Sequence, residues 1–184
     1  VFSKGADSLE DGFNAASEMK RAVDADPQNY DAWIHLGLAH KLTAEMLGGD
    51  EKFRATFLNK ALDCFREAYR LYPQNADISM FLARTLDGMR KLEEAGKWWT
   101  IALRWGDGSR LVHHYYGDHL MALGNYKEAV EHYFAALHRH GGWKRAVLEK
   151  KKDRAVTLLR RQIEEAQKGL APGDSTPVPD APPK

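Results

Sequence analysis

The sequence has little of what several classes of protein require. It contains one cysteine, Cys64, which excludes an internal disulfide framework and any Cys-x-x-Cys metal or redox site. Its 27 Lys and Arg residues nearly balance 26 Asp and Glu residues, so the overall charge does not argue for a dedicated nucleic-acid binder. No apolar run approaches the roughly 20 residues of a membrane-spanning helix. The remaining composition, 43% hydrophobic and 29% charged, is typical of a globular protein.

Motifs of common enzymes are also missing from the sequence. It has no phosphate-binding GxxxxGK[ST], no dinucleotide-binding GxGxxG and no zinc-protease HExxH. The serines and the cysteine lack the surroundings of an activated nucleophile. We therefore expect a protein that is not an enzyme, uses no cofactor and takes no small-molecule substrate.

The first residue is Val1, and no apolar segment typical of a signal peptide follows it. The missing initiator Met favours an exported, periplasmic or cell-envelope protein, with the cytoplasm as the alternative. The sequence otherwise leaves the compartment open.

Most of the chain, from about residue 8 to residue 170, has the pattern of α-helices. Apolar residues recur every three or four positions, and no stretch alternates with period two. Turn-forming residues interrupt this pattern at 26–29, 48–50, 72–75, 106–108, 124–125 and 141–142. The sequence therefore predicts an all-α chain of antiparallel helices with short connections.

The helical region contains an internal repeat. The tripeptide Pro-Gln-Asn occurs at 27–29 and again at 73–75, and Gly37 and Gly117 form a second, more widely spaced pair of matching positions. The separation of the two tripeptides exceeds one period of about 34 residues by twelve residues. The separation of the two glycines exceeds two periods by the same twelve residues. We infer a single twelve-residue insertion between Gly37 and the second tripeptide.

With that insertion allowed, the spacing resembles the tetratricopeptide repeat (TPR). The first unit reads Trp33-x2-Leu36-Gly37-x2-His40, then Ala61-x3-Phe65-x2-Ala68 and Pro73. Two more units follow in register, one with Ala83 and Trp99 and one with Gly117 and Tyr133. The resemblance implies a right-handed solenoid of helical hairpins closed by a C-terminal capping helix, in which the aromatic residues are core. Solenoids of this kind are stable because successive hairpins stack.

The repeat divides the chain into six predicted segments. They are a half-repeat helix at 1–28, a hairpin with the insertion at 29–75, hairpins at 76–109 and 110–142, a basic capping helix at 143–170, and a proline-rich tail at 171–184. The tail holds five of the seven prolines and favours an extended polyproline conformation. Whether it is disordered, binds a partner or folds back on the groove stays open.

The resemblance also implies a binding groove lined by the first helix of each hairpin. The predicted lining is Ile34, Leu38, Lys41, Met80, Arg84, Leu111, His114, Asp118 and Met121. Chaperone-binding members of the family clamp a terminal carboxylate there with Lys, Arg and Asn, and none of these types stands at Ile34, Leu38, His114 or Asp118. We therefore expect a mostly apolar groove for an amphipathic helix or an extended apolar peptide.

Two further surfaces are candidates for contact. The insertion, between Thr43 and Lys60, should lengthen each helix of its hairpin by about six residues, or roughly 9 Å, with Asp50 as the N-cap of the second helix. The predicted contacts of this extended hairpin are Met46, Leu47, Phe53 and Phe57. The last helix carries a basic patch of Lys144, Arg145, Lys150, Lys151, Arg154, Arg160 and Arg161.

Six of the eight histidines lie in the third hairpin, at 113–140, but none is four residues from another. Helical metal sites favour that spacing, so we expect no metal site here. The favoured function is a scaffold or adaptor subunit that binds a protein segment in its groove within a larger assembly. The alternatives are head-to-tail self-assembly, or binding of an anionic surface or of nucleic acid by the basic helix. Nucleic acid is the less expected of these partners, and contact with a membrane surface stays open.

Overall fold

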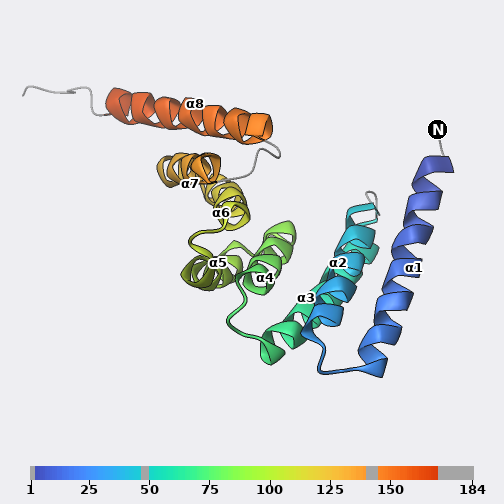
Figure 1. Ribbon diagram of the computed structural model, residues 1–184. Coiled ribbons are helices and arrows are strands. Elements are labelled where there is room, and N and C mark those ends of the chain that lie inside the picture. Colours follow the sequence, from blue (N-terminus) through green and yellow to red (C-terminus); the bar gives the residue numbers. More distant parts are fainter. Residues whose placement is uncertain (1–2, 47–49, 140–144, 170–184) are drawn as a thin grey trace, which may run out of the picture.

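The computed structural model describes residues 3–46, 50–139 and 145–169. Within these ranges the chain forms eight helices and no strand. The helices are α1 (Ser3–Ala25), α2 (Tyr30–Met46), α3 (Glu51–Leu71), α4 (Ala76–Gly88), α5 (Leu92–Gly106), α6 (Arg110–Leu123), α7 (Tyr126–His138) and α8 (Arg145–Gly169). Figure 1 shows them as an arc that begins with α1 and ends with α8.

The arc is built from three antiparallel hairpins, α2–α3, α4–α5 and α6–α7, with α1 packed on α2 and α8 packed on α7. The first helices α4 and α6 also touch each other, and they lie on the inner side of the arc relative to α5 and α7 (Figure 1). This architecture confirms the predicted all-α stack of helical hairpins. The proline-rich tail, 171–184, lies outside the described residues.

Asparagine and aspartate side chains start several of the helices. Asn29 Oδ1 accepts hydrogen bonds from the first backbone amides of α2, and Asn75 Oδ1 does the same for α4. The repeated Pro-Gln-Asn tripeptide therefore ends in an N-cap each time. Asp50 caps α3, with the Phe53 amide 3.1 Å from its Oδ1, as the sequence predicts.

The core follows the period of the repeat. Phe65, Trp99 and Tyr133, which are one period apart from each other, are at most 1% exposed. In two hairpins a glycine faces the large ring, because a Cβ on Gly37 would lie 2.5 Å from the Phe65 ring and one on Gly117 would lie 2.6 Å from the Tyr133 ring. Small and large residues thus alternate so that two helices of a hairpin can approach closely.

The insertion lengthens the first hairpin unevenly. Helix α2 has 17 residues and α3 has 21, whereas the helices of the next two hairpins have 13–15. Within the described residues most of the added length is in α3, and the prediction of about six residues on α2 stays untested because residues 47–49, which follow Met46, lie outside the described residues. Helix α1 runs beside the extension, where the rings of Phe13 and Phe57 are 5.7 Å apart. On the other side the Arg54 guanidinium donates a 2.9 Å hydrogen bond to the Gly88 carbonyl of α4.

The close approach at Gly37 gives a test of this packing. Gly37→Ala should lower the free energy of unfolding by about 1–3 kcal/mol, because the added methyl overlaps the buried Phe65 ring. Gly96→Ala is the matched control, since its Cβ would lie 3.7 Å from His119 Nε2, which is ordinary contact. It should raise the stability by up to about 1 kcal/mol through helix propensity. Urea unfolding measures both, and shifts of the same sign would contradict the packing.

Candidate protein-binding surface

The inner surface of the arc is only partly the groove that the sequence predicts. Ile34, Met80 and His114 occupy equivalent positions of the three hairpins, and they are 8%, 2% and 5% exposed. Ile34 and Met80 belong to the main hydrophobic core. These three side chains therefore offer little surface to a partner, contrary to the prediction. The reason is that successive hairpins pack directly on each other, so this position points at a neighbouring helix.

The other predicted groove residues keep some surface. Leu111 is 39% exposed. The half-buried residues are Leu38, Lys41, Arg84, Asp118 and Met121. They come from α2, α4 and α6, so these predicted groove residues are spread over all three hairpins.

Two aromatic residues of this surface were missed in the sequence. Phe81 and Tyr115 are half-buried and lie one repeat period apart, so they occupy equivalent positions of α4 and α6. Phe81 stacks on Phe65 with ring centroids 5.4 Å apart, and the Arg84 guanidinium lies 3.6 Å over the Tyr115 ring. The spacing of one period between Phe81 and Tyr115 is the signal that could have identified them.

A polar network joins the third hairpin to the capping helix. The Lys151 ammonium of α8 donates to both carboxylate oxygens of Asp118, at 2.7 and 2.6 Å, and to His114 Nε2 at 2.9 Å. The Tyr133 hydroxyl donates to the same carboxylate at 2.7 Å. Burial, followed by this hydrogen bond, raises the pKa of Tyr133. Two predicted groove residues, His114 and Asp118, therefore hold α8 in place.

The basic patch is correspondingly divided. Lys151 pairs with Asp118, and Arg145 pairs with Glu149 at 3.0 Å. Lys144 lies outside the described residues. The exposed members are Arg145, Lys150, Arg154, Arg160 and Arg161. A role of these five cations in binding an anionic surface stays a prediction.

The extended hairpin has a buried and an exposed part. Phe57 is 8% exposed because α1 covers it, whereas Phe53, one helical turn away, is 56% exposed. Met46 is 38% exposed, and Leu42, which precedes it by one turn of α2, is 46% exposed. Leu47 lies outside the described residues. Exposed apolar side chains therefore continue along the extension beyond the groove.

Buried histidines of the third hairpin form hydrogen bonds within the protein. His113 Nε2 lies 2.7 Å from the Asp107 carbonyl, which can only accept, so this nitrogen carries a hydrogen. His113 Nδ1 lies 2.8 Å from His132 Nδ1. In the neutral pair His132 is therefore the donor and His113 the acceptor.

A second histidine network spans three helices. His119 Nδ1 lies 2.7 Å from Asp87 Oδ1, and the Trp99 indole donates to the other Asp87 oxygen at 2.9 Å. The network joins α4, α5 and α6 inside the stack, where His119 is 3% exposed. It is a packing element rather than an open site.

Nothing in the described ranges groups three or more His, Cys, Asp or Glu side chains in a way that could hold a metal ion. Burial raises the pKa of Cys64 to about 12, so its thiol stays protonated near neutral pH. Of the described helices, none combines the length and the apolar character that crossing a membrane requires.

Comparison with known proteins identifies the repeat. A family model described as Tetratricopeptide repeat matches residues 46–109. The structure of TTC0263, a TPR protein of Thermus thermophilus, superposes with a TM-score of 0.72 at 19% identity, covering 82% of this chain and 75% of that one. Residues 46–109 therefore match the tetratricopeptide repeat, and over most of its length the chain shares the fold of TPR proteins. No curated protein sequence gives a significant match.

Other TPR structures share the fold at similar identities. MamA superposes with a TM-score of 0.58 at 17% identity, covering 92% of this chain and 97% of that one. The first TPR of Spaghetti (RPAP3), solved with the HSP90 peptide SRMEEVD, has a TM-score of 0.52 at 16% identity, covering 67% of this chain and 93% of that one. TPR domains are generally modules for binding other proteins.

The network at Asp118 predicts how the last helix is held. Lys151→Met should speed amide hydrogen exchange across α8 about 1.4- to fivefold, because a one-third-exposed ion pair contributes about 0.2–1 kcal/mol. Lys150→Met, one residue earlier on the exposed face, should leave the exchange unchanged. Hydrogen exchange followed by mass spectrometry on peptides from 145–169 measures both variants. Equal rates in the two variants would show that Lys151 does not anchor α8.

The histidine pair predicts a loss of stability in acid. Burial, followed by the charges of His113 and Arg139, lowers the pKa of His132 in the folded protein, with Glu131 and Asp107 acting in the opposite direction. The unfolded chain therefore takes up this proton near its ordinary pKa of about 6.5, where the folded chain still resists it. Stability should be complete above about pH 6.5 and should fall as the pH drops toward the lowered pKa.

Urea midpoints at about pH 7.5 and about pH 5.5 test this effect. The difference between them should shrink in His132→Gln and persist in the exposed control His138→Gln. It should not vanish, because burial and the Lys60 charge also lower the pKa of His40. An unchanged difference in His132→Gln would exclude the pair as the source.

Proposed function

We propose that this protein is a non-catalytic scaffold or adaptor that holds a segment of a partner protein against the inner face of its arc. The observation that carries the proposal is a row of half-buried side chains on three successive first helices. Leu38 comes from α2, Phe81 and Arg84 from α4, and Tyr115 from α6. Apolar and aromatic side chains that keep part of their surface in a concave stack suit a peptide or a helix with one apolar face.

The stacked pair Arg84–Tyr115 gives the surface a polar feature. The guanidinium lies over the ring at 3.6 Å, so its N–H groups can point sideways and donate to a partner's carbonyl or carboxylate. The ring also restricts the arginine before binding, which reduces the entropy lost when a partner is held. The surface therefore favours a segment that places an acceptor beside apolar residues.

The extended hairpin supplies additional apolar length in this proposal. Leu38, Leu42 and Met46 follow one another at intervals of four, so they lie along one face of α2. The last two are exposed and lie where the insertion lengthens the hairpin. A partner segment that lies across the hairpins can therefore continue along α2 toward its end.

Leu42→Glu tests the proposal in the full-length chain. Leu42 is 46% exposed, so the variant should fold normally, but a bound partner would bury an unpaired carboxylate there. A cost of about 2 kcal/mol or more weakens binding at least tenfold. Asn59→Glu, on the exposed face of α3 in the same hairpin, is the matched control. Met80 is unsuitable for such a test, because at 2% exposure its substitution by Glu would disrupt the core.

Tagged wild-type and variant proteins would be used to recover partners from native cells, with identification by mass spectrometry. A partner that is lost with Leu42→Glu and retained with Asn59→Glu supports the inner face as the binding surface. Retention of every partner by both Leu42→Glu and Arg84→Glu would overturn it.

A further inference from the structure

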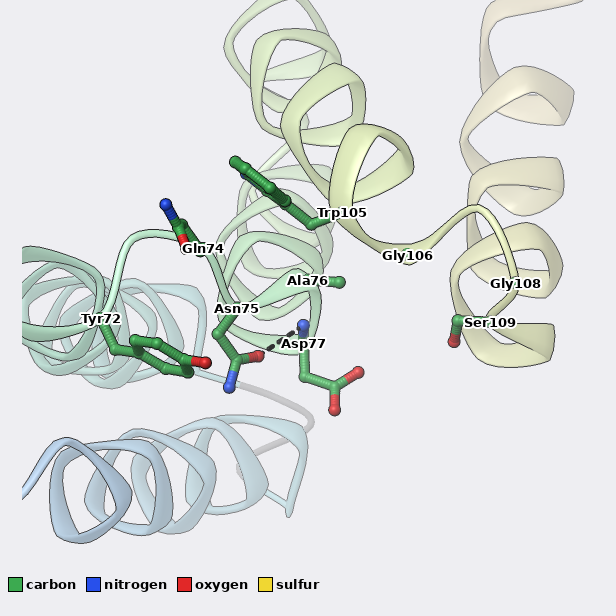
Figure 2. Close-up of a pocket in the computed structure, with 9 residues that line it drawn as sticks. All are labelled: Tyr72, Gln74, Asn75, Ala76, Asp77, Trp105, Gly106, Gly108 and Ser109. Atoms are coloured by element: carbon green, nitrogen blue, oxygen red, sulfur yellow. Dashed lines mark hydrogen bonds between the residues drawn. The ribbon is translucent and has the colours of Figure 1, made fainter.

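A pocket of about 470 Å³ lies away from the inner face, between the turn that joins α3 to α4 and the turn that joins α5 to α6. We call it the turn pocket. Its main side chains are Tyr72, Gln74, Asn75, Asp77, Trp105 and Ser109. Figure 2 shows Tyr72 and Trp105 on either side of the turn segment that carries Gln74 and Asn75.

Exposed aromatic rings border this pocket. Tyr72 is 44% exposed and Trp105 48% exposed, and a third ring, Tyr30, lies 5.1 Å from Tyr72 and is 37% exposed. All three stand at helix ends, at the start of α2 and the ends of α3 and α5. Large aromatic surfaces around a hollow cost solvation when left bare and offer flat faces to a ligand.

The polar groups of the pocket complement these rings. The Asn75 side-chain oxygen accepts from the amides of α4, and the NH₂ group of the same side chain can donate to a ligand. Gln74 provides a second amide, and Asp77 provides a carboxylate. A polyproline II segment has apolar ring faces and carbonyls with no partner of their own, so aromatic faces beside amide donors match it.

The chain itself contains a segment of this chemistry. Residues 179–184 read Pro-Asp-Ala-Pro-Pro-Lys, a PxxP sequence followed two residues later by a lysine. The lysine complements the carboxylates near the pocket, Asp77 in its lining and Asp107 in the α5–α6 turn. We propose that residues 179–184 of one molecule bind in the turn pocket of a second copy.

The length of the tail favours a second copy over the same molecule. Helix α8 passes the α6–α7 turn at Gln162, which borders a pocket with Gly124, and continues to Gly169, about 10 Å further. The turn pocket lies at the opposite end of α6, whose 14 residues span about 21 Å. Ten residues separate Gly169 from Pro179 and can span at most about 33–36 Å, whereas the return past Gln162 and along α6 takes about 31 Å before any sideways step. A tether held so near its full extension gives little effective concentration.

Two complementary variants of the full-length chain test the proposal. Tyr72→Ala with Trp105→Ala removes the pocket rings and keeps the tail, whereas Pro179→Ala with Pro182→Ala keeps the pocket and removes the tail motif. All four side chains are exposed or outside the described helices, so both variants should keep the wild-type helix content. Sedimentation from about 10 μM to about 1 mM should show association of the wild type and monomers for each variant alone. An equal mixture of the two variants should associate again, because each supplies what the other lacks.

The Trp105 indole signal in nuclear magnetic resonance spectra reports on the pocket. The Pro179→Ala/Pro182→Ala protein (the tail variant) keeps the pocket, and it would be isotopically labelled. Its Trp105 signal should shift when the unlabelled Tyr72→Ala/Trp105→Ala protein (the pocket variant) is added. Failure of the mixture to associate, or an unshifted signal, would overturn the proposal. A signal that already differs between dilute monomeric wild type and the tail variant would place the tail in its own molecule's pocket and overturn the second-copy assignment. Leu42→Glu should leave this self-association unchanged. The test of the turn pocket is therefore independent of the test of the proposed partner surface on the inner face.

Discussion

The fold depends on close approach of the two helices within each hairpin. Phe65 and Tyr133 fill the space between hairpins only because Gly37 and Gly117 leave room for their rings, at distances where a methyl group would overlap. A single hairpin has no other surface to cover such rings, so each one is buried by its neighbours. This constraint sets how closely the first and second helices of these hairpins approach each other.

The end of the stack is stabilised differently from its middle. At the position of Gly37 and Gly117 in the repeat, α8 carries Lys151, which no second helix covers within the described residues. Its ammonium reaches across to Asp118, which also accepts from Tyr133. A charged side chain thus replaces a close helix contact where the repeat stops, so the last helix is attached to the stack while most of its length stays polar and exposed.

The sequence predicted the helices from their periodicity, and the resemblance to the TPR implied the aromatic core that Phe65, Trp99 and Tyr133 form. It was wrong about Ile34, Met80 and His114, because a helical phase says which residues share a face and not which neighbour that face meets. The hydrogen bond between His113 and His132 could not be predicted from the sequence either, since 19 residues separate the two histidines and no repeat relates them. Such contacts depend on how the hairpins are rotated relative to each other.

Burial at Ile34 and Met80 changes where a partner can gain affinity. With these side chains committed to the core, the inner face offers apolar surface mainly through Leu38, Phe81 and Tyr115. A half-buried side chain has already lost much of its freedom, so a partner that covers it loses little further entropy. In the proposed mode of binding, the core therefore prepares the inner face by holding its side chains in place, and the extension of α2 adds length to a surface that is otherwise restricted to three short helices.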